Sequence, residues 1–184
     1  NNKSLDDRYP TLSDRERMVK IANNYDLDSN MFMSPEEIRK LIDLSGENNR
    51  FVRLVERESG EKTFLRIFDD EMVFPTEAEI TAAFKRLVMD LPTVGFLQGH
   101  GERDCAKEGD RDYNLFAWAK TYRYALINRG FDIVEVSLSE ELPEKLDILV
   151  IADMKTPLSG EEMARLNAYV ERGGNLLIVG EPRR

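Results

Sequence analysis

Continuous apolar runs dominate the second half of the chain. Four of them stand out: TVGFL (93–97), FDIVEVSL (131–138), LDILVIAD (146–153) and NLLIVGE (175–181). Three of these runs have the composition of parallel strands that are covered on both faces. With the helical segments between them, the order is strand, helix, strand, strand, helix, strand. We therefore predict a mostly parallel sheet between residues 93 and 182.

The helices are predicted from a shared start signal. A Ser or Thr followed three residues later by Glu forms a capping box, in which hydroxyl and carboxylate bind free N–H groups of the first turn. The chain has four such pairs: Ser13 with Glu16, Ser34 with Glu37, Thr76 with Glu79, and Ser159 with Glu162. They predict helices over 13–24, 35–44, 77–88 and 160–172. A fifth helix is predicted over 112–128, where DYNLFAWAKTYRYALIN ends before Gly130.

The stretch from 50 to 68 has a different pattern, in which two apolar and basic runs flank Glu58-Ser59-Gly60-Glu61. A short polar turn with a glycine between such runs is typical of an antiparallel hairpin. We expect Val52 and Leu54 to share a face with cross-strand partners such as Leu65 and Ile67.

Together these elements predict an α/β protein. Residues 91–184 are expected to form a flavodoxin-like three-layer domain, although the connection between 138 and 146 is too short for a full crossover helix. Residues 1–90 are expected to form a small α+β unit that contains the hairpin 50–68. The chain begins without Met and ends just after a predicted buried strand. We therefore expect a fragment of a longer protein, whose second domain is truncated at its C-terminal end.

The composition of the chain argues against several classes of function. Hydrophobic residues make up 41% of the chain and charged residues 33%, with a net charge of -9 and a pI near 4.8. Binding to nucleic acid or to an anionic membrane surface is disfavoured, because no basic arm is present to neutralise phosphates. The single cysteine, Cys105, excludes an internal disulfide and a Cys-cluster zinc site. No apolar run approaches the roughly 18 residues of a membrane span.

Candidate chemistry gathers where the predicted strands end. Ligands on open α/β sheets bind outside the carboxyl ends of the strands. Polar residues emerge there after three runs, and they form the candidate rim for a ligand or partner: Gln98, Gly99, His100, Gly101, Glu102, Asp153 and Glu181. The only histidine of the chain, His100, stands between two glycines of this rim.

Four interpretations of the glycine-histidine turn remain open. A dinucleotide site would need a third glycine, and Glu102 and Asp104 would repel a pyrophosphate; a Walker loop is absent. A divalent metal could take His100, Glu102, Asp104 and Asp153 as ligands. A nucleophile would require Cys105 to pair with His100, yet no glycine elbow surrounds it. In the fourth, the glycines supply backbone freedom for a tight turn, and His100 caps or hydrogen-bonds the loop.

Three segments carry a family resemblance: VGFLQGHGERD (94–104), DYNLFAWAKTYRYALINRGFDIVEVSL (112–138) and LDILVIADMKTPLSGEEMARLNAYVERGGNLLIVGEP (146–182). The sequence resembles the extracytoplasmic domain of GldG-like proteins, which are auxiliary components of ABC transporters. Such proteins are known from gliding-motility loci and from uncharacterised ABC transport systems. The most specific matches are Gly99-His100-Gly101-Glu102 and Gly173-Gly174-Asn175-Leu176-Leu177. The chain departs from the family at Met154-Lys155, where a proline-containing turn is usual.

The resemblance implies a class I glutamine-amidotransferase-like, flavodoxin-like fold without the amidotransferase nucleophile and with no established catalytic residue. It implies a protein on the periplasmic side of the inner membrane, anchored by segments outside this fragment, with ABC transporter membrane and ATPase subunits as partners. We therefore expect a non-enzymatic binding or interaction domain of a transport or gliding-motility complex, with no cofactor and no metal. The alternative is a hydrolase or metal-dependent enzyme that uses the rim residues His100, Glu102, Asp153 and Glu181.

Overall fold

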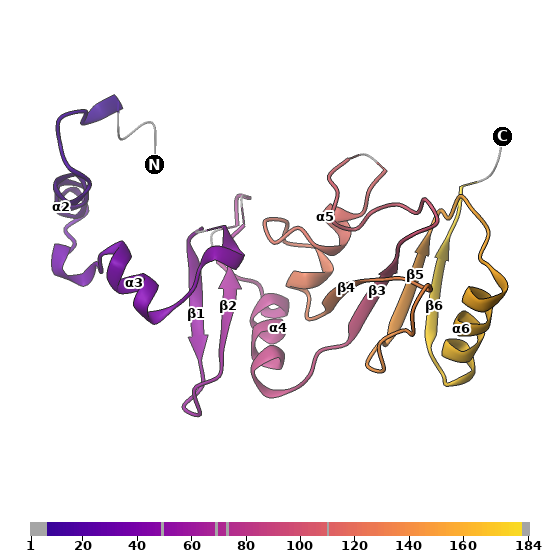
Figure 1. Cartoon of the computed structure of the whole chain (residues 1–184). Helices are drawn as coiled ribbons and strands as arrows, with labels where there is room; N and C mark the ends of the chain where they lie inside the picture. The colour runs from indigo at the N-terminus through magenta and orange to yellow at the C-terminus, as the bar shows by residue number, and fades with distance from the viewer. Residues whose placement is uncertain (1–6, 49, 69, 73, 110, 182–184) are drawn as a thin grey trace. The chain divides into compact units, whose positions relative to one another are not determined.

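A computed structural model describes residues 7–48, 50–68, 70–72, 74–109 and 111–181 (Figure 1). Contacts between residues divide the chain into two compact units, Asn1–Arg50 and Phe51–Arg184. Each unit is described by itself. The division expected from the sequence, at residues 90 and 91, stays a prediction about where the domains separate.

The first unit is helical and has little core. It contains α2 (Asp14–Asn24), η1 (Ser29–Met31), α3 (Pro35–Leu41) and η2 (Ser45–Glu47). The capping boxes expected at Ser13 and Ser34 are formed. Helix α3 ends before the predicted residue 44 because Ile42 is extended, with φ -155°. Of the apolar side chains described in this unit, only Ala22 is buried.

The second unit begins with the hairpin of β1 (Val52–Glu56) and β2 (Lys62–Arg66). The hairpin itself is confirmed, but the expected pairing is wrong by one residue: Val52 pairs with Arg66 and Leu54 with Phe64. The loop comprises residues 58–60, since the Arg57 N–H donates to the Glu61 carbonyl at 2.9 Å, and Gly60 in this loop has φ +99°. A one-residue slip of register moves every partner to the other face.

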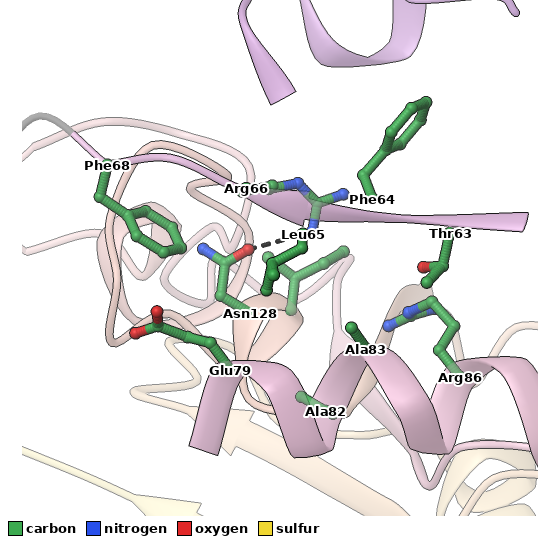
Figure 2. Close-up of a pocket in the computed structure, with 12 residues that line it drawn as sticks. Thr63, Phe64, Leu65, Arg66, Phe68, Glu79, Ala82, Ala83, Arg86 and Asn128 are labelled. Atoms are coloured by element: carbon green, nitrogen blue, oxygen red, sulfur yellow. Dashed lines mark hydrogen bonds between the residues drawn. The ribbon is translucent and has the colours of Figure 1, made fainter. Parts of the chain in front are cut away.

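Helix α4 (Glu77–Val88) covers one face of this hairpin. Figure 2 shows Thr63 and Leu65 directed toward Ala82 and Ala83 of the helix, whereas Phe64 points away from it. The cavity left between hairpin and helix is only about 20 Å³. That is room for one water molecule, so this cavity is packing space and no ligand pocket.

The sheet of the second unit has four parallel strands, β3 (Thr93–Leu97), β4 (Asp132–Val136), β5 (Ile148–Ala152) and β6 (Asn175–Val179). Their order is β4-β3-β5-β6 (Figure 1). The predicted α/β fold with a small hairpin sheet is confirmed. Strand β3, the first of the four in the sequence, lies inside the sheet. The chain places β4 on one side of β3 and then β5 on the other side.

Apolar side chains cover the sheet on both faces. On one face, α6 (Gly160–Glu171) contributes Leu166 and Tyr169 to a cluster with strand residues such as Leu149. The short β4–β5 connection adds three buried leucines to this cluster, Leu138, Leu142 and Leu146. On the other face, the long β3–β4 connection packs against Phe96 and Val150. The result is the three-layer arrangement expected from the sequence.

The predicted helix over 112–128 is wrong as a continuous element. The structure has only α5 (Asn114–Ala117) and η3 (Leu126–Asn128). The Asn128 amide explains the break, because its Nδ2 donates to three backbone carbonyls, those of Ala119, Lys120 and Tyr122, at 3.2, 3.4 and 2.7 Å. A side chain that binds these carbonyls replaces the backbone N–H groups that a helix would use.

A buried ion cluster fastens this broken segment to the hairpin and α4. The Arg123 side chain is 3% exposed, as is that of Glu79. Its Nη1 lies 2.6 Å from the Glu79 carboxylate, its Nε 2.6 Å from Asp70, and its Nη2 donates to the Met72 carbonyl at 2.9 Å. Glu79 also accepts from the Thr76 N–H at the start of α4. One guanidinium thus connects the β3–β4 segment to α4 and to the chain between β2 and α4, 44 to 53 residues earlier in the sequence.

Replacing Arg123 by Met is expected to lower the free energy of unfolding by about 3–5 kcal/mol, because it leaves the Glu79 charge buried without its cation. Denaturant unfolding followed by far-UV circular dichroism measures the loss. Arg111→Met is the control, since the Arg111 side chain is 78% exposed; exposed ion pairs contribute about 1 kcal/mol or less. Equal, small losses for both variants would contradict a structural role for the Arg123 cluster.

Candidate functional site

The candidate rim lies at the carboxyl ends of β3 and β5, where the strand order reverses. In flavodoxin-like folds this topological switch point is the usual position of a ligand. Two loops leave the sheet here, one beginning at Gln98 after β3 and one at Asp153 after β5. Gln98 itself continues the strand pairing, with its N–H donating to the Val136 carbonyl at 2.9 Å.

Hydrogen bonds join the two loops across the switch point. The His100 carbonyl accepts from the N–H groups of Lys155 and Thr156, at 2.9 and 3.1 Å. On the other side of the turn, the Arg103 N–H donates to the Ala152 carbonyl at 2.8 Å. These hydrogen bonds hold the two loops together at the switch point.

The His100 ring contacts helix α6 and is not directed toward the other rim residues. Its Nδ1 lies 3.2 Å from the Thr156 hydroxyl, and its Nε2 lies 3.0 Å from Glu162 Oε1. Glu162 belongs to the capping box of α6 and accepts the Ser159 N–H with its second oxygen. The Ser159 N–H and hydroxyl, helped by His100, lower the pKa of Glu162. The imidazole thus connects the turn to the start of α6.

Both glycines of the turn use a backbone conformation that side chains disfavour. Gly99 has φ +123° and Gly101 has φ +76°. A Cβ on Gly101 would also lie 3.2 Å from the Lys155 side chain. Within the turn the Glu102 carboxylate accepts the His100 N–H at 2.7 Å. Its other oxygen, Oε1, is buried and has no hydrogen-bond partner among the residues that the structure describes.

Arg103 brings the two remaining rim carboxylates together. Its Nε lies 3.5 Å from Asp153, and its Nη2 pairs with Glu181. The Lys155 ammonium also pairs with Asp153, and this contact, followed by the charge of Arg103, holds the Asp153 pKa below its usual value. Arg103 was not among the predicted rim residues. The only signal for it in the sequence is its position between the acidic residues Glu102 and Asp104.

A solvent-open depression of about 380 Å³ lies beside these charges. Its apolar wall comes from Ile151, Met154, Ile178 and Val179, and its charged edge from Asp153, Lys155 and Glu181. The volume falls in the range of roughly 300–1,000 Å³ that is typical of small-molecule sites. The rim therefore offers a shallow surface of mixed polarity at the ends of β5 and β6.

The metal set considered from the sequence is not assembled in the described part of the chain. His100, Glu102 and Asp153 are turned to separate partners. The ligand atoms that do converge belong to Asp104, Cys105 and Glu135, all within 4.8 Å of one another. The Cys105 thiol is fully buried, and burial together with the nearby Glu135 and Asp104 raises its pKa to about 12. The thiol is therefore protonated near neutral pH, which does not suit a nucleophile.

The comparison with protein families agrees with this architecture. The family described as "ABC-type uncharacterized transport system" matches residues 91–184, which include the whole parallel sheet and the rim. The chain belongs to this family of ABC transporter auxiliary components. No curated protein and no solved structure matches it. Among the described residues, no helix has the length and apolar character needed to cross a membrane.

Replacing Gly101 by Val is expected to destabilise the protein by about 2 kcal/mol or more, because a positive φ costs most residues roughly 1–2 kcal/mol and the branched side chain meets Lys155. Gly101→Asn is the matched control, since Asn tolerates the left-handed region. Thermal unfolding compares the two. A Val variant as stable as the Asn variant would show that the turn does not depend on this conformation.

The native Cys105 thiol is expected to resist alkylation and disulfide exchange at pH 8, because it is buried and protonated below a pKa of about 12. It should react once the protein is unfolded in guanidinium. Titration with a chromogenic disulfide reagent, with and without denaturant, measures the difference. Rapid labelling of the native protein would reveal an accessible thiolate at this position.

Proposed function

We propose that this chain supplies a non-enzymatic, extracytoplasmic interaction domain of an ABC-type transport complex, of the kind that GldG-like proteins provide in gliding-motility systems. The observation that carries the proposal is the closed switch point. The loops after β3 and β5 are joined through the His100 carbonyl, at the point where ligands of flavodoxin-like folds usually bind.

The side chains of the rim support a role in recognition more than one in acid–base catalysis. A general acid or base needs a proton that it can exchange with a substrate at hydrogen-bond distance. Both ring nitrogens of His100 are engaged, and the carboxylates of Asp153 and Glu181 are paired with Arg103. These pairs give the rim a fixed pattern of charge, which favours specific contact with a partner.

The partners proposed for this chain are the membrane and ATPase subunits of the transporter. The family assignment supports a place in such a complex. The periplasmic side of the inner membrane and an anchor in other parts of the protein are proposed from the resemblance to GldG-like proteins. The exposed parts of the rim that would meet a subunit are Lys155 and Glu181, whose side chains are 56% and 46% exposed.

Site-specific photo-crosslinking in cells tests the proposal. A photoreactive amino acid is placed at Lys155, and the matched control carries it at Lys145, whose side chain is 81% exposed at the opposite end of the strands. We expect the Lys155 variant to form a crosslink with a subunit of an ABC transporter, identified by mass spectrometry, and the Lys145 variant to form none.

Crosslinks of equal yield at both positions, or none to a transporter subunit from Lys155, would contradict the rim as the contact surface. The enzymatic alternative has its own readout. Calorimetric titration with zinc and with manganese that shows tight binding, abolished by His100→Ala, would make the rim a metal site instead.

A further inference from the structure

The only histidine of the chain lies between polar side chains of two other segments. The side chains of His100 and Glu162 are 13% and 16% exposed, and Nε2 of the ring lies 3.0 Å from Oε1 of Glu162. On the other side of the ring, Nδ1 lies 3.2 Å from the Thr156 hydroxyl. The ring thus joins the turn after β3 to the first turn of α6 and to the segment before that helix.

Both protonation states of the ring fit this geometry, but they differ in charge. In the imidazolium form both ring nitrogens donate, Nε2–H to the Glu162 carboxylate and Nδ1–H to the Thr156 hydroxyl. In the neutral form only one nitrogen carries a proton, so the Thr156 hydroxyl must donate to Nδ1 if Nε2–H is to stay with Glu162. Loss of the proton therefore keeps the hydrogen bonds and removes the attraction between opposite charges, which salt screens little at this low exposure.

Glu162 keeps its charge while the ring titrates. Its second oxygen accepts the Ser159 N–H at 2.7 Å. The Ser159 N–H and hydroxyl, followed by His100, hold the Glu162 pKa below its usual value. A histidine changes its charge between about pH 5 and pH 8, where such a carboxylate stays ionised. His100 is therefore the member of the pair whose charge responds to pH.

Other charged side chains lie around the turn. The Glu102 carboxylate accepts the His100 backbone N–H at 2.7 Å and so belongs to the turn itself. Asp153, which follows β5, pairs with Lys155 and with Arg103. These groups are engaged within the turn or with one another, whereas the carboxylate on α6 is in direct contact with the ring.

We propose that His100 and Glu162 form a pH-sensitive clasp, which holds the turn after β3 firmly against α6 at about pH 5 and loosely at about pH 8. This inference goes beyond the proposed function. The ion pair stabilises the contact while the ring is charged, and that contribution is lost as the pH rises. The backbone bonds from Lys155 and Thr156 to the His100 carbonyl contain no titrating group, so the two loops stay joined in both states. The clasp therefore changes how firmly the start of α6 is held against the rim.

A double-mutant cycle of thermal unfolding tests the clasp. The unchanged chain, His100→Gln, Glu162→Gln and the double variant are compared at pH 5 and pH 8; the glutamine that replaces Glu162 can still close the capping box of α6. We expect the two side chains to be coupled by about 2–4 °C in Tm at pH 5 and by less than half of that at pH 8. Glu161→Gln is the matched control. Glu161 is the neighbouring residue on α6 and is 87% exposed, so its replacement should have the same effect on Tm at both pH values.

Nuclear magnetic resonance follows the clasp without unfolding the protein. Because His100 is the only histidine, the imidazole signals need no assignment. Between about pH 5 and pH 8, the amide signals of the first turn of α6 should shift together with the ring signals. In Glu162→Gln the ring should still titrate, and the amides of α6 should no longer follow it.

A coupling that is equal at pH 5 and pH 8, or amides of α6 that do not follow the ring in the unchanged chain, would overturn the inference. If His100→Gln does not fold, Glu162→Gln remains decisive, because its loss of Tm must be larger at pH 5 than at pH 8. None of these outcomes depends on the crosslinking result at Lys155.

Discussion

The carbonyl of His100 holds the candidate rim of this fold together. By accepting from both Lys155 and Thr156, it joins the loops after β3 and β5 where a flavodoxin-like protein would bind its ligand. The other contacts at the rim are built around these two hydrogen bonds. The glycines adopt positive φ to bring the carbonyl into place, the imidazole reaches α6, and Arg103 is left to pair Asp153 with Glu181.

A second constraint extends the fold beyond the sheet. The buried Arg123 guanidinium binds Glu79 and Asp70 and so holds the hairpin and α4 against the β3–β4 connection. Separating the segments would leave a buried charge without its partner, which is costly, so the ion cluster holds them in place. The second unit is thus a sheet domain with a hairpin extension.

Local signals predicted most of these elements. The capping boxes at Ser13, Ser34 and Ser159 start α2, α3 and α6, and the apolar runs became the four parallel strands. The predicted helix over 112–128 failed for one local and one distant reason. The Asn128 amide binds backbone carbonyls within the same segment, and Arg123 binds Asp70 and Glu79, which are more than 40 residues away in the sequence. At the site, the two glycines predicted the turn at His100. Its contact with Glu162 could not be predicted, because the two residues are 62 positions apart in the sequence. Arg103 belongs to no recognisable motif.

Native-state hydrogen exchange at the rim tests this closure most directly. The amides of Lys155, Thr156 and Arg103 each donate across the switch point, and their exchange rates report how often the two loops separate. Protection close to that of the buried strand amides of β3 and β5 is expected if the closed rim is a permanent part of the fold. Exchange of these three amides that is orders of magnitude faster, with the strands still protected, would show that the loops open and expose a crevice for a substrate.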